Sequence, residues 1–432
     1  MNYLAQCQAC ISAHYALKYD FKQIRRIQWQ RLRRLVTEAY LSIPYYRQRL
    51  DEAGVEPSDL QSLDDLHRLP VMTKADFQSA DPRSLLSQRI LPARLVREQT
   101  SGSSGRPFVM YFDEAYRRMR KALFLRALVD CGYRPGQRLL IVTSREKTGV
   151  PAWMGWRYVS YKDPPHHNIE QHNSIRPHVL YGWVTPMRQM AEVIRNKGLV
   201  VHRPNVLITT AETLDPPTHR LLGEAFGCPV YEIYGLTETG TVAWQSPSQP
   251  HFRISHESMI VEFLSGPDAG PARRLVVTNL GLRSMPFIRY DTGDLAIPIA
   301  AQASATATDA AATLPAIERV DGRHVDCVRL GDGRIVSPFE LTTAMEAVPG
   351  VSRYQIVQER TDVFTVRYVP GGDGDSSAGV TEQAARNVLG EVVGTDVQIN
   401  VQAMTSLDPP PGQKFRVVQS RLAQAHTEGV LA

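Results

Sequence analysis

The sequence has 432 residues, of which 43% are hydrophobic and 22% are charged, as in an ordinary globular protein. This length suits one large domain with a smaller one, or two to three ordinary domains. The net charge of +5 is modest, and basic residues mix with apolar ones at helical spacing, so we expect no nucleic-acid partner. No segment approaches the roughly 20 apolar residues of a membrane helix, so we expect no membrane partner.

Cysteine usage points to a reducing compartment. The five cysteines are odd in number and scattered, which fits free thiols better than a disulfide framework. The amino terminus lacks the compact apolar core of a signal peptide, so we expect a mature, cytoplasmic protein. Cys7 and Cys10 form a CxxC pair without a second pair or a histidine cluster, which favours two thiols on a helix over a zinc site.

Helix and strand patterns alternate through the first half of the chain. A helix is expected over residues 20–41, and Thr73 is expected to cap a short helix. Strand, Gly/Ser loop and strand follow between residues 91 and 112, and then a long helix over 113–131. The alternation continues with strands at 138–143, 179–180, 206–209 and 230–233 and with helices near 186–198 and 216–226. This order predicts a parallel or mixed sheet with helices on both faces.

The second half favours strands first and then a small α/β unit. Further strands are expected at 259–264, 274–279 and 287–290, and the Ala/Thr/Ser-rich residues 299–314 predict a mobile loop or hairpin tip. From about residue 322 the expected elements are strands near 354–358, 363–368 and 397–403 and helices near 338–348 and 380–393. The fold class is therefore α/β, with a large N-terminal domain (1–321) of mixed sheets and flanking helices and a small C-terminal α/β domain (322–432).

The segment Thr100–Pro107 combines hydroxyl side chains with two glycines. Gly102 and Gly105 allow the backbone to approach an anion with its N–H groups, and the hydroxyls add donors. The segment lacks the Gly-Lys-Ser/Thr ending of a Walker loop, and a strand pattern follows it. Alone, such a segment also fits a flexible linker.

Two further motifs lie near strand ends. Tyr234-Gly235-Leu236-Thr237-Glu238 follows a strand at its carboxyl end, where open α/β sheets bind ligands, and its aromatic ring, glycine, hydroxyl and carboxylate suit a nucleotide with magnesium. The segment 289–294 ends another expected strand, and Asp294 could accept hydrogen bonds from a ribose diol. Taken separately, a helix cap and an Asx turn explain them equally well.

Lys414 is the last of only eight lysines and follows a Pro/Gly run, whereas the basic residues around it are arginines. A compact ammonium on a flexible stem suits a transient contact with a charged group better than a planar guanidinium does. Its isolation could also arise by chance.

In this order the motifs resemble the adenylate-forming superfamily of acyl-CoA synthetases, and within it the phenylacetate–CoA ligase-like branch. The resemblance runs from about residue 28 to 420. It includes three more segments: Leu69-Pro70 with Thr73-Lys74, Thr210-Ala211-Glu212, and Gly322-Arg323 with Asp326.

The resemblance implies ATP and Mg²⁺ as cofactors and a role for each matching residue. The β- and γ-phosphates would be held by Thr100, Ser101, Gly102, Ser103, Ser104 and Gly105. The adenine pocket would comprise Ala211, Glu212, Glu232, Tyr234 and Gly235, with Tyr234 stacked on the base.

The remaining roles concern the reacting groups. Thr237 would contact the α-phosphate, and Glu238 would bind Mg²⁺. Asp294 would bind the ribose hydroxyls, with Arg323 nearby. Lys414, carried by the small domain, would bridge the carboxylate and the α-phosphate during adenylation. The small domain would then rotate about a hinge, for which Val325 and Asp326 both remain candidates because the acid follows Arg323 by three residues instead of two.

The implied activity is ATP-dependent, AMP-forming activation of a small-molecule carboxylic acid through an acyl-adenylate, followed by thioester formation with CoA. An amine or a carrier-protein thiol remains open as the alternative acceptor, and the oligomeric state, a homodimer included, also remains open. A nucleotide-binding protein without catalysis is disfavoured by the presence of Glu238, Asp294 and Lys414. Because His251 and His256 have no nearby cysteine, we predict no structural zinc.

Residues 145–185 are rich in aromatic side chains and histidines. They could be core aromatics with a polar surface loop, or they could form the wall of a pocket for an aryl or other planar acid.

Overall fold

The computed structural model describes most of the chain. The described residues are Cys10 and the ranges 16–99, 108–143, 155–265, 271–299, 314–323, 326–345, 347–371, 378–407 and 415–422. Within them, no helix is both long and apolar enough to cross a membrane.

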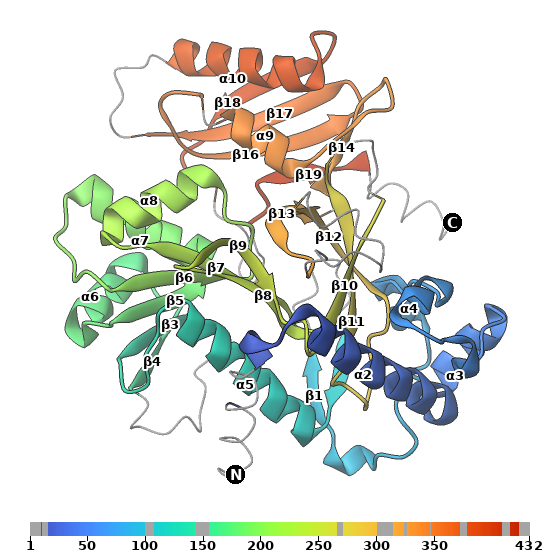
Figure 1. Ribbon diagram of the computed structural model, residues 1–432. Coiled ribbons are helices and arrows are strands. Elements are labelled where there is room, and N and C mark those ends of the chain that lie inside the picture. The colour runs from blue at the N-terminus through green and yellow to red at the C-terminus, as the bar shows by residue number, and fades with distance from the viewer. Residues whose placement is uncertain are drawn as a thin grey trace.

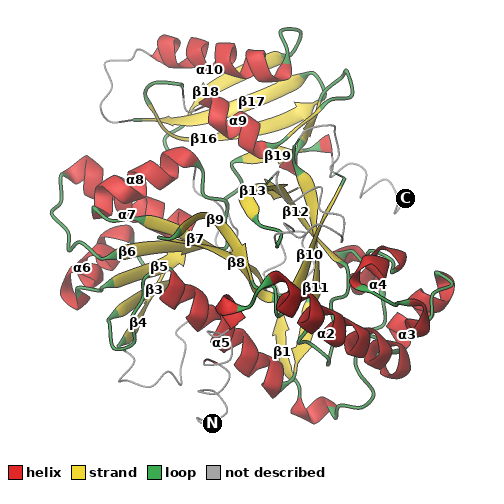
Figure 2. Cartoon of the chain, in the orientation of Figure 1, coloured by secondary structure: helices red, strands yellow, loops and turns green. Residues whose placement is uncertain are grey.

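The large N-terminal part is built on one 11-stranded sheet (Figures 1 and 2). Its strands lie in the order β10 (Met259–Leu264), β11 (Arg273–Asn279), β12 (Tyr290–Pro298), β13 (Ile317–Arg323), β9 (Gln249–Ile254), β8 (Gly240–Ser246), β7 (Val230–Leu236), β6 (Val206–Thr210), β5 (Val179–Trp183), β3 (Leu139–Thr143) and β4 (Trp156–Ser160). The run from β4 to β7 is parallel and the rest is antiparallel. The predicted mixed sheet is therefore confirmed.

Helices cover both faces of the parallel half, as the alternation of strands and helices predicted. The long helices here are α5 (Glu114–Asp130), α6 (Pro165–Ile175), α7 (Val184–Lys197) and α8 (Pro216–Phe226). Successive residues of a strand point to opposite faces. Leu139 of β3 accordingly shares a buried cluster with Leu128 of α5, whereas Leu140 shares one with Met187 of α7.

The chain before the sheet forms a helical layer and a short hairpin. The helices are α2 (Phe21–Ser42), α3 (Pro44–Glu52) and α4 (Lys74–Ser79), and the hairpin pairs β1 (Val96–Gln99) with β2 (Val109–Phe112). Short 3-10 turns lie at Ala16–Lys18, Pro57–Asp59, Leu63–Arg68 and Pro92–Arg94. The predicted capping of α4 is confirmed, because the Thr73 hydroxyl accepts a hydrogen bond from the backbone of Asp76 (3.2 Å).

An aromatic cluster joins this layer to the antiparallel half of the sheet. The ring of Phe287 lies 5.2 Å from that of Phe77 and 5.1 Å from that of Tyr290. Above the cluster, Met72 pairs with Tyr290 in a parallel bridge, in which the Met72 N–H donates to the Arg289 carbonyl (2.9 Å). Segments about 220 residues apart are therefore held side by side.

The residues after Asp326 form a separate small α/β layer, which Figure 1 shows above the large sheet. Its four-stranded sheet has the order β18 (Gln398–Ala403), β17 (Val363–Pro370), β16 (Val351–Arg360) and β19 (Val418–Ser420), with helices α9 (Pro338–Met345) and α10 (Ala378–Val393) and a two-stranded sheet of β14 (Val328–Arg329) and β15 (Ile335–Val336). These elements bury a hydrophobic cluster of their own. The predicted small C-terminal α/β domain is confirmed.

Three local predictions differ from the structure. Residues 287–290 were expected to form a strand, but β12 begins only at Tyr290, and Phe287 and Ile288 are buried in the preceding loop. Helix α3 was not predicted, although Pro44 takes its first position, where the missing N–H costs nothing. One interpretation of residues 145–185 included a polar surface loop, whereas residues 165–175 within this segment form the helix α6. The expected loop tip at 299–314 lies almost entirely outside the described residues.

We expect Phe287→Ala to lower the free energy of unfolding of the large part by about 3–5 kcal/mol, because it leaves a cavity between the rings of Phe77 and Tyr290. Urea denaturation monitored by fluorescence measures this change. Leu91→Ala, at an exposed position, is the control and should change stability by less than about 0.5 kcal/mol. Equal effects of the two substitutions would contradict the role of this cluster.

Candidate functional site

Two carboxylates, each hydrogen-bonded by a tyrosine hydroxyl, lie at one end of the large sheet. The Tyr234 hydroxyl donates to Asp294 Oδ2 (2.6 Å), and the Tyr290 hydroxyl donates to Glu238 Oε1 (3.3 Å). Glu238 is only 6% exposed. Burial, followed by Asp294, raises the pKa of Tyr234 well above its ordinary value, and burial, followed by Glu238, does the same for Tyr290. Both phenols therefore remain donors at any physiological pH.

The strands bring these four residues together. Tyr234 lies near the carboxyl end of β7, and Glu238 lies in the turn from β7 to β8. Tyr290 and Asp294 lie on β12, which belongs to the antiparallel half of the sheet. The sequence prediction that Asp294 ends a strand is wrong, because the motif forms the first half of β12.

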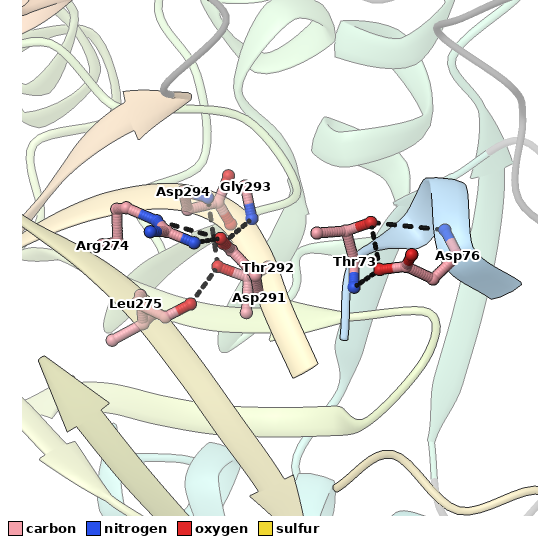
Figure 3. Close-up of polar contacts among 8 residues, drawn as sticks. All are labelled: Thr73, Asp76, Arg274, Leu275, Asp291, Thr292, Gly293 and Asp294. Carbon is pink, nitrogen blue, oxygen red and sulfur yellow. Dashed lines mark hydrogen bonds and ion pairs between the residues drawn. The ribbon is translucent and has the colours of Figure 1, made fainter. Parts of the chain in front are cut away.

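A local turn orients Asp294. The Gly293 N–H donates to Asp291 Oδ1 (2.9 Å), and the Asp294 N–H donates to the Thr292 hydroxyl (3.0 Å). Asp291 is itself paired with Arg274, and Figure 3 shows this group close to the Thr73–Asp76 cap of α4. Gly293 has a φ of 75°, which a residue with a side chain rarely adopts. The Asx turn that the sequence also allowed for this motif is therefore present. It orients the carboxylate of Asp294, to which the resemblance assigns the ribose hydroxyls.

Gly235 has a structural reason to be glycine. A Cβ at this position would lie 2.8 Å from the carbonyl oxygen of Gly240 on β8. The backbone of Gly235 therefore lies close to the neighbouring strand β8, at the point where β7 turns into β8. Thr237, in the same turn, is exposed.

Ala211 and Glu212 follow β6 and lie beside the start of α7. Ala211 has a φ of 73°, in the left-handed region. Glu212 Oε2 accepts a hydrogen bond from the Thr185 N–H (2.7 Å) in the first turn of α7, where a carboxylate also interacts favourably with the helix dipole. The side chain of Glu212 thus anchors α7.

Glu232 carries an acidic group whose pKa is raised to about 8. Burial of its carboxyl group is the main cause, and the nearby carboxylate of Asp215 adds to it, while a hydrogen bond from the backbone of Leu214 opposes the shift. Asp215 is held at the N-terminus of α8, where it accepts a bond from the Thr218 N–H (2.8 Å). Glu232 is therefore largely protonated at neutral pH.

Lys74 lies in this site, although the motifs predict no role for it. It is half-buried at the first position of α4, two residues after the Met72–Tyr290 bridge. Desolvation lowers its pKa, the nearby positive charge of Arg323 adds to this effect, and the nearby Glu238 opposes it. The signal that could have identified it is its place in the Leu69–Lys74 segment of the resemblance, in a chain with only eight lysines.

Arg323 and Asp326 lie where the large sheet leads into the small domain. Arg323 ends β13, and its Nε lies 3.9 Å from Asp294 Oδ1. Asp326, the next described residue, forms an ion pair with Arg416 of the small domain. The site thus includes the end of β13, the last strand of the large sheet before the small domain begins.

Several predicted site residues lie outside the described part of the chain. They are Thr100, Ser101, Gly102, Ser103, Ser104, Gly105, Lys414 and the hinge candidate Val325. Their flanks are described: Gln99 pairs with Val109 across the β1–β2 hairpin, and Phe415 lies under the guanidinium of Arg353 (4.1 Å).

Glu238 has the chemistry expected of a magnesium ligand. Its carboxylate is buried in a turn and, among the described residues, accepts a long hydrogen bond from Tyr290 (3.3 Å), and carboxylate oxygens are ligands that suit a hard cation. Among the described residues, no group of three or more His, Cys, Asp or Glu side chains could hold a metal by itself. Mg²⁺ that binds with a nucleotide takes one or two protein carboxylates together with phosphate oxygens, and a single carboxylate such as that of Glu238 fits this pattern.

The described part of the aromatic segment 145–185 contributes both to the core and to a stack near the strand ends. Trp156 donates to the Tyr133 hydroxyl (3.0 Å), and His172 is fully buried on α6. The rings of Tyr161 and Trp183, which lie just after β4 and at the end of β5, stack at 4.9 Å.

Comparison with known proteins agrees with the motif order. No family model matches the chain. The sequence is 27% identical over 360 residues to a phenylacetate-coenzyme A ligase of Thermus thermophilus, covering 78% of this chain and 79% of that protein. It is 22% identical over 445 residues to one of Pseudomonas putida, covering 93% and 95%. The resemblance found in the motifs is thereby confirmed.

Solved structures give the fold. A 2-hydroxyisobutyryl-CoA ligase in its postadenylation state, bound to an adenylate, superposes with a TM-score of 0.75 at 21% identity over 95% of this chain and 92% of that one. The same ligase in its thioesterification state gives a TM-score of 0.59 at 20% identity over 95% and 93%. The chain therefore shares the fold of these ligases.

The raised pKa of Glu232 predicts a pH dependence of stability. Between about pH 5 and pH 8 the folded protein binds a proton that the unfolded chain has released, so stability falls as the pH rises through this window. Glu232→Gln removes this dependence. As the pH rises, we expect the variant to become more stable relative to the unmodified protein. The ratio of their folding equilibrium constants should increase by at most about tenfold per pH unit.

Denaturation at pH 5, 6, 7 and 8 measures the effect. Glu224→Gln, at an exposed position of α8, is the control. A constant difference between Glu232→Gln and the unmodified protein over the whole range would show that Glu232 does not hold a proton in the folded state.

Proposed function

We propose that this chain, which resembles phenylacetate–CoA ligases in sequence and has the fold of the adenylate-forming ligases, activates a carboxylic acid with ATP and passes the acyl group to CoA. The observation that carries the proposal is the convergence of Glu238 and Asp294, each held by a tyrosine, at one end of the sheet. They come from the two motifs that the resemblance assigns to Mg²⁺ and to the ribose.

We assign the nucleotide contacts along this edge. Asp294 accepts from the ribose hydroxyls, with Arg323 beside it, and Tyr234 faces the base. Ala211, Glu212, Glu232 and Gly235 line the adenine pocket, with Glu212 contributing its backbone because its side chain anchors α7. Residues 100–105 hold the β- and γ-phosphates.

The chemistry requires two anions to meet. A carboxylate oxygen attacks the α-phosphorus, the bond to pyrophosphate breaks, and an acyl-adenylate forms. Glu238 would hold Mg²⁺, which would neutralise part of the phosphate charge, and Thr237 would contact the α-phosphate. Lys414 bridges the carboxylate and the α-phosphate, and Lys74 adds a cation from the large domain. The CoA thiolate then attacks the acyl carbon and AMP leaves.

We place the division between the domains at 321/322, within β13, and a hinge next to it at Val325 or Asp326. Rotation of the small domain would carry Lys414 away from the adenylate and admit the acceptor. The Asp326–Arg416 ion pair supports a hinge here, because it ties the start of the small domain to the residue two places after Lys414.

The proposal extends to the class of acid that the enzyme activates and to its location in the cell. The Tyr161–Trp183 stack at the ends of β4 and β5 supports a planar or aryl acid. Cys131 and Cys228 are buried free thiols, which supports a cytoplasmic location.

Exchange of labelled pyrophosphate into ATP tests the function. We expect exchange that depends on an added carboxylic acid, with aryl acids in the panel, and AMP release that accelerates when CoA is added. Acceleration by amines or by a carrier protein in place of CoA would correct the acceptor. Absence of exchange across a broad panel would contradict adenylation itself.

The two lysines predict different losses. Lys414→Ala should reduce adenylation by about 10²–10³-fold and spare acyl transfer from a preformed adenylate, because the small domain removes Lys414 after the first step. Lys74→Ala should slow both half-reactions, because Lys74 belongs to the large domain. Single-turnover assays of each step measure this, with exposed Lys22→Ala of α2 as the control. Equal loss of both steps in Lys414→Ala would refute the rotation.

A further inference from the structure

Arg120 of α5 connects two parts of the chain that flank the proposed phosphate site. Its Nη1 donates to Glu98 Oε2 (3.1 Å) on β1, and Glu98 precedes Thr100 by two residues. On its other side, Arg120 packs against Gly240, which follows Glu238 by two residues. A Cβ at Gly240 would lie 3.1 Å from Arg120 Nε and 3.2 Å from its Cγ.

The guanidinium is held in place by stacking as well as by charge. It lies 4.8 Å from the ring centre of Phe112 on β2 and 5.9 Å from that of Tyr116, one turn earlier on α5. Phe112 and Tyr116 are fully buried, so the surface under Arg120 is rigid. A planar guanidinium can stack and form the ion pair at once, which an ammonium cannot do equally well.

The turn that carries Glu238 is clamped from the same helix. The Tyr116 hydroxyl donates to the Thr239 carbonyl (2.8 Å), and Asn279 Nδ2 donates to that carbonyl (3.1 Å) and to the Tyr116 hydroxyl (2.6 Å). Tyr116 and Arg120 are four residues apart and so lie on one face of α5. The helix therefore holds the Glu238 turn with one side chain and the β1 strand with the next.

We propose that Arg120, through Glu98 and Gly240, is a positioning residue that sets the phosphate-binding segment after β1 relative to the Glu238 turn. The inference rests on the proposed function, which assigns the β- and γ-phosphates to residues 100–105 and Mg²⁺ to Glu238. These two parts act on the same pyrophosphate group, and a displacement of about 1 Å between them can cost up to 10²-fold in rate.

The alternative is that the pair only stabilises the fold. The Arg120 and Glu98 side chains are 21% and 33% exposed. Partly exposed pairs of this kind contribute at most about 1 kcal/mol to stability, so the loss of this one leaves the protein folded. If the pair only stabilised the fold, its loss would not change the affinity for one substrate, or the rate of one half-reaction, more than the others.

The test is a double-mutant cycle with Glu98→Gln and Arg120→Met. We expect each single variant to raise the Kd of MgATP and the KM of ATP and pyrophosphate in the exchange assay by about tenfold. The KM of the acid should stay within about twofold, because the acid is not held by the segments that Arg120 joins. Acyl transfer from a preformed adenylate should also stay within about twofold, because no pyrophosphate takes part in that step. The double variant should lose no more than either single one, since both break one link. Arg120→Lys, which keeps the charge, should recover part of the loss.

Arg117→Met is the matched control, because it breaks an ion pair with Glu114 on the same helix. Losses that multiply in the double variant, a uniform loss in both half-reactions, or unchanged pyrophosphate and ATP affinities would overturn the inference. The Kd of MgATP is measured without an acid. A protein that binds MgATP but does not exchange pyrophosphate therefore contradicts the proposed function while the cycle still tests Arg120. A protein that binds no MgATP contradicts both.

Discussion

The site depends on holding two carboxylates, Glu238 and Asp294, in the same buried region. Carboxylates brought together out of water repel one another unless donors or cations accompany them. Here a phenol from a strand binds each one, Tyr290 for Glu238 and Tyr234 for Asp294. The raised pKa of each phenol keeps it protonated at physiological pH, so both donors are in place before any nucleotide binds. Such preorganisation is what electrostatic catalysis requires.

The position of Tyr290 depends in turn on the segment 67–74 of the N-terminal layer. Arg289, buried and with a φ of 46°, binds Glu262 of β10 through Nε (3.0 Å) and Nη2 (2.8 Å) and the His67 carbonyl through Nη1 (2.9 Å). The energetic cost of its left-handed backbone is offset by these charge-assisted bonds. This segment contains the Met72–Tyr290 bridge, and Lys74 follows it by two residues and lies near Glu238. A residue near the start of the chain thus joins a site made of strand ends from its middle.

The sequence could predict the elements and residues whose signals are local. Thr73 with Asp76 is a capping box, and the Tyr234–Glu238 motif lies at the carboxyl end of a strand, so both could be recognised without tertiary contacts. Phe287 misled the strand prediction because a buried loop and a strand can share an apolar pattern. Lys74 and Arg120 received no role because their partners, Glu238 and Glu98 with Gly240, are set by tertiary packing. The assignments of residues 100–105 and Lys414 remain predictions.

The cations of the proposed centre come from three separate parts of the chain, and this separation has a mechanistic consequence. Lys74 belongs to the N-terminal layer, Arg323 to the end of β13, and Lys414 to the small domain. In the proposed mechanism, cations on the large domain would stay beside the phosphate in both half-reactions, so they would stabilise charge that the two steps share. The charge unique to adenylation, where the carboxylate meets the α-phosphate, requires a cation that can leave, because the acceptor must later approach the same carbon. A lysine on a small domain that rotates, as proposed for Lys414, would meet that requirement.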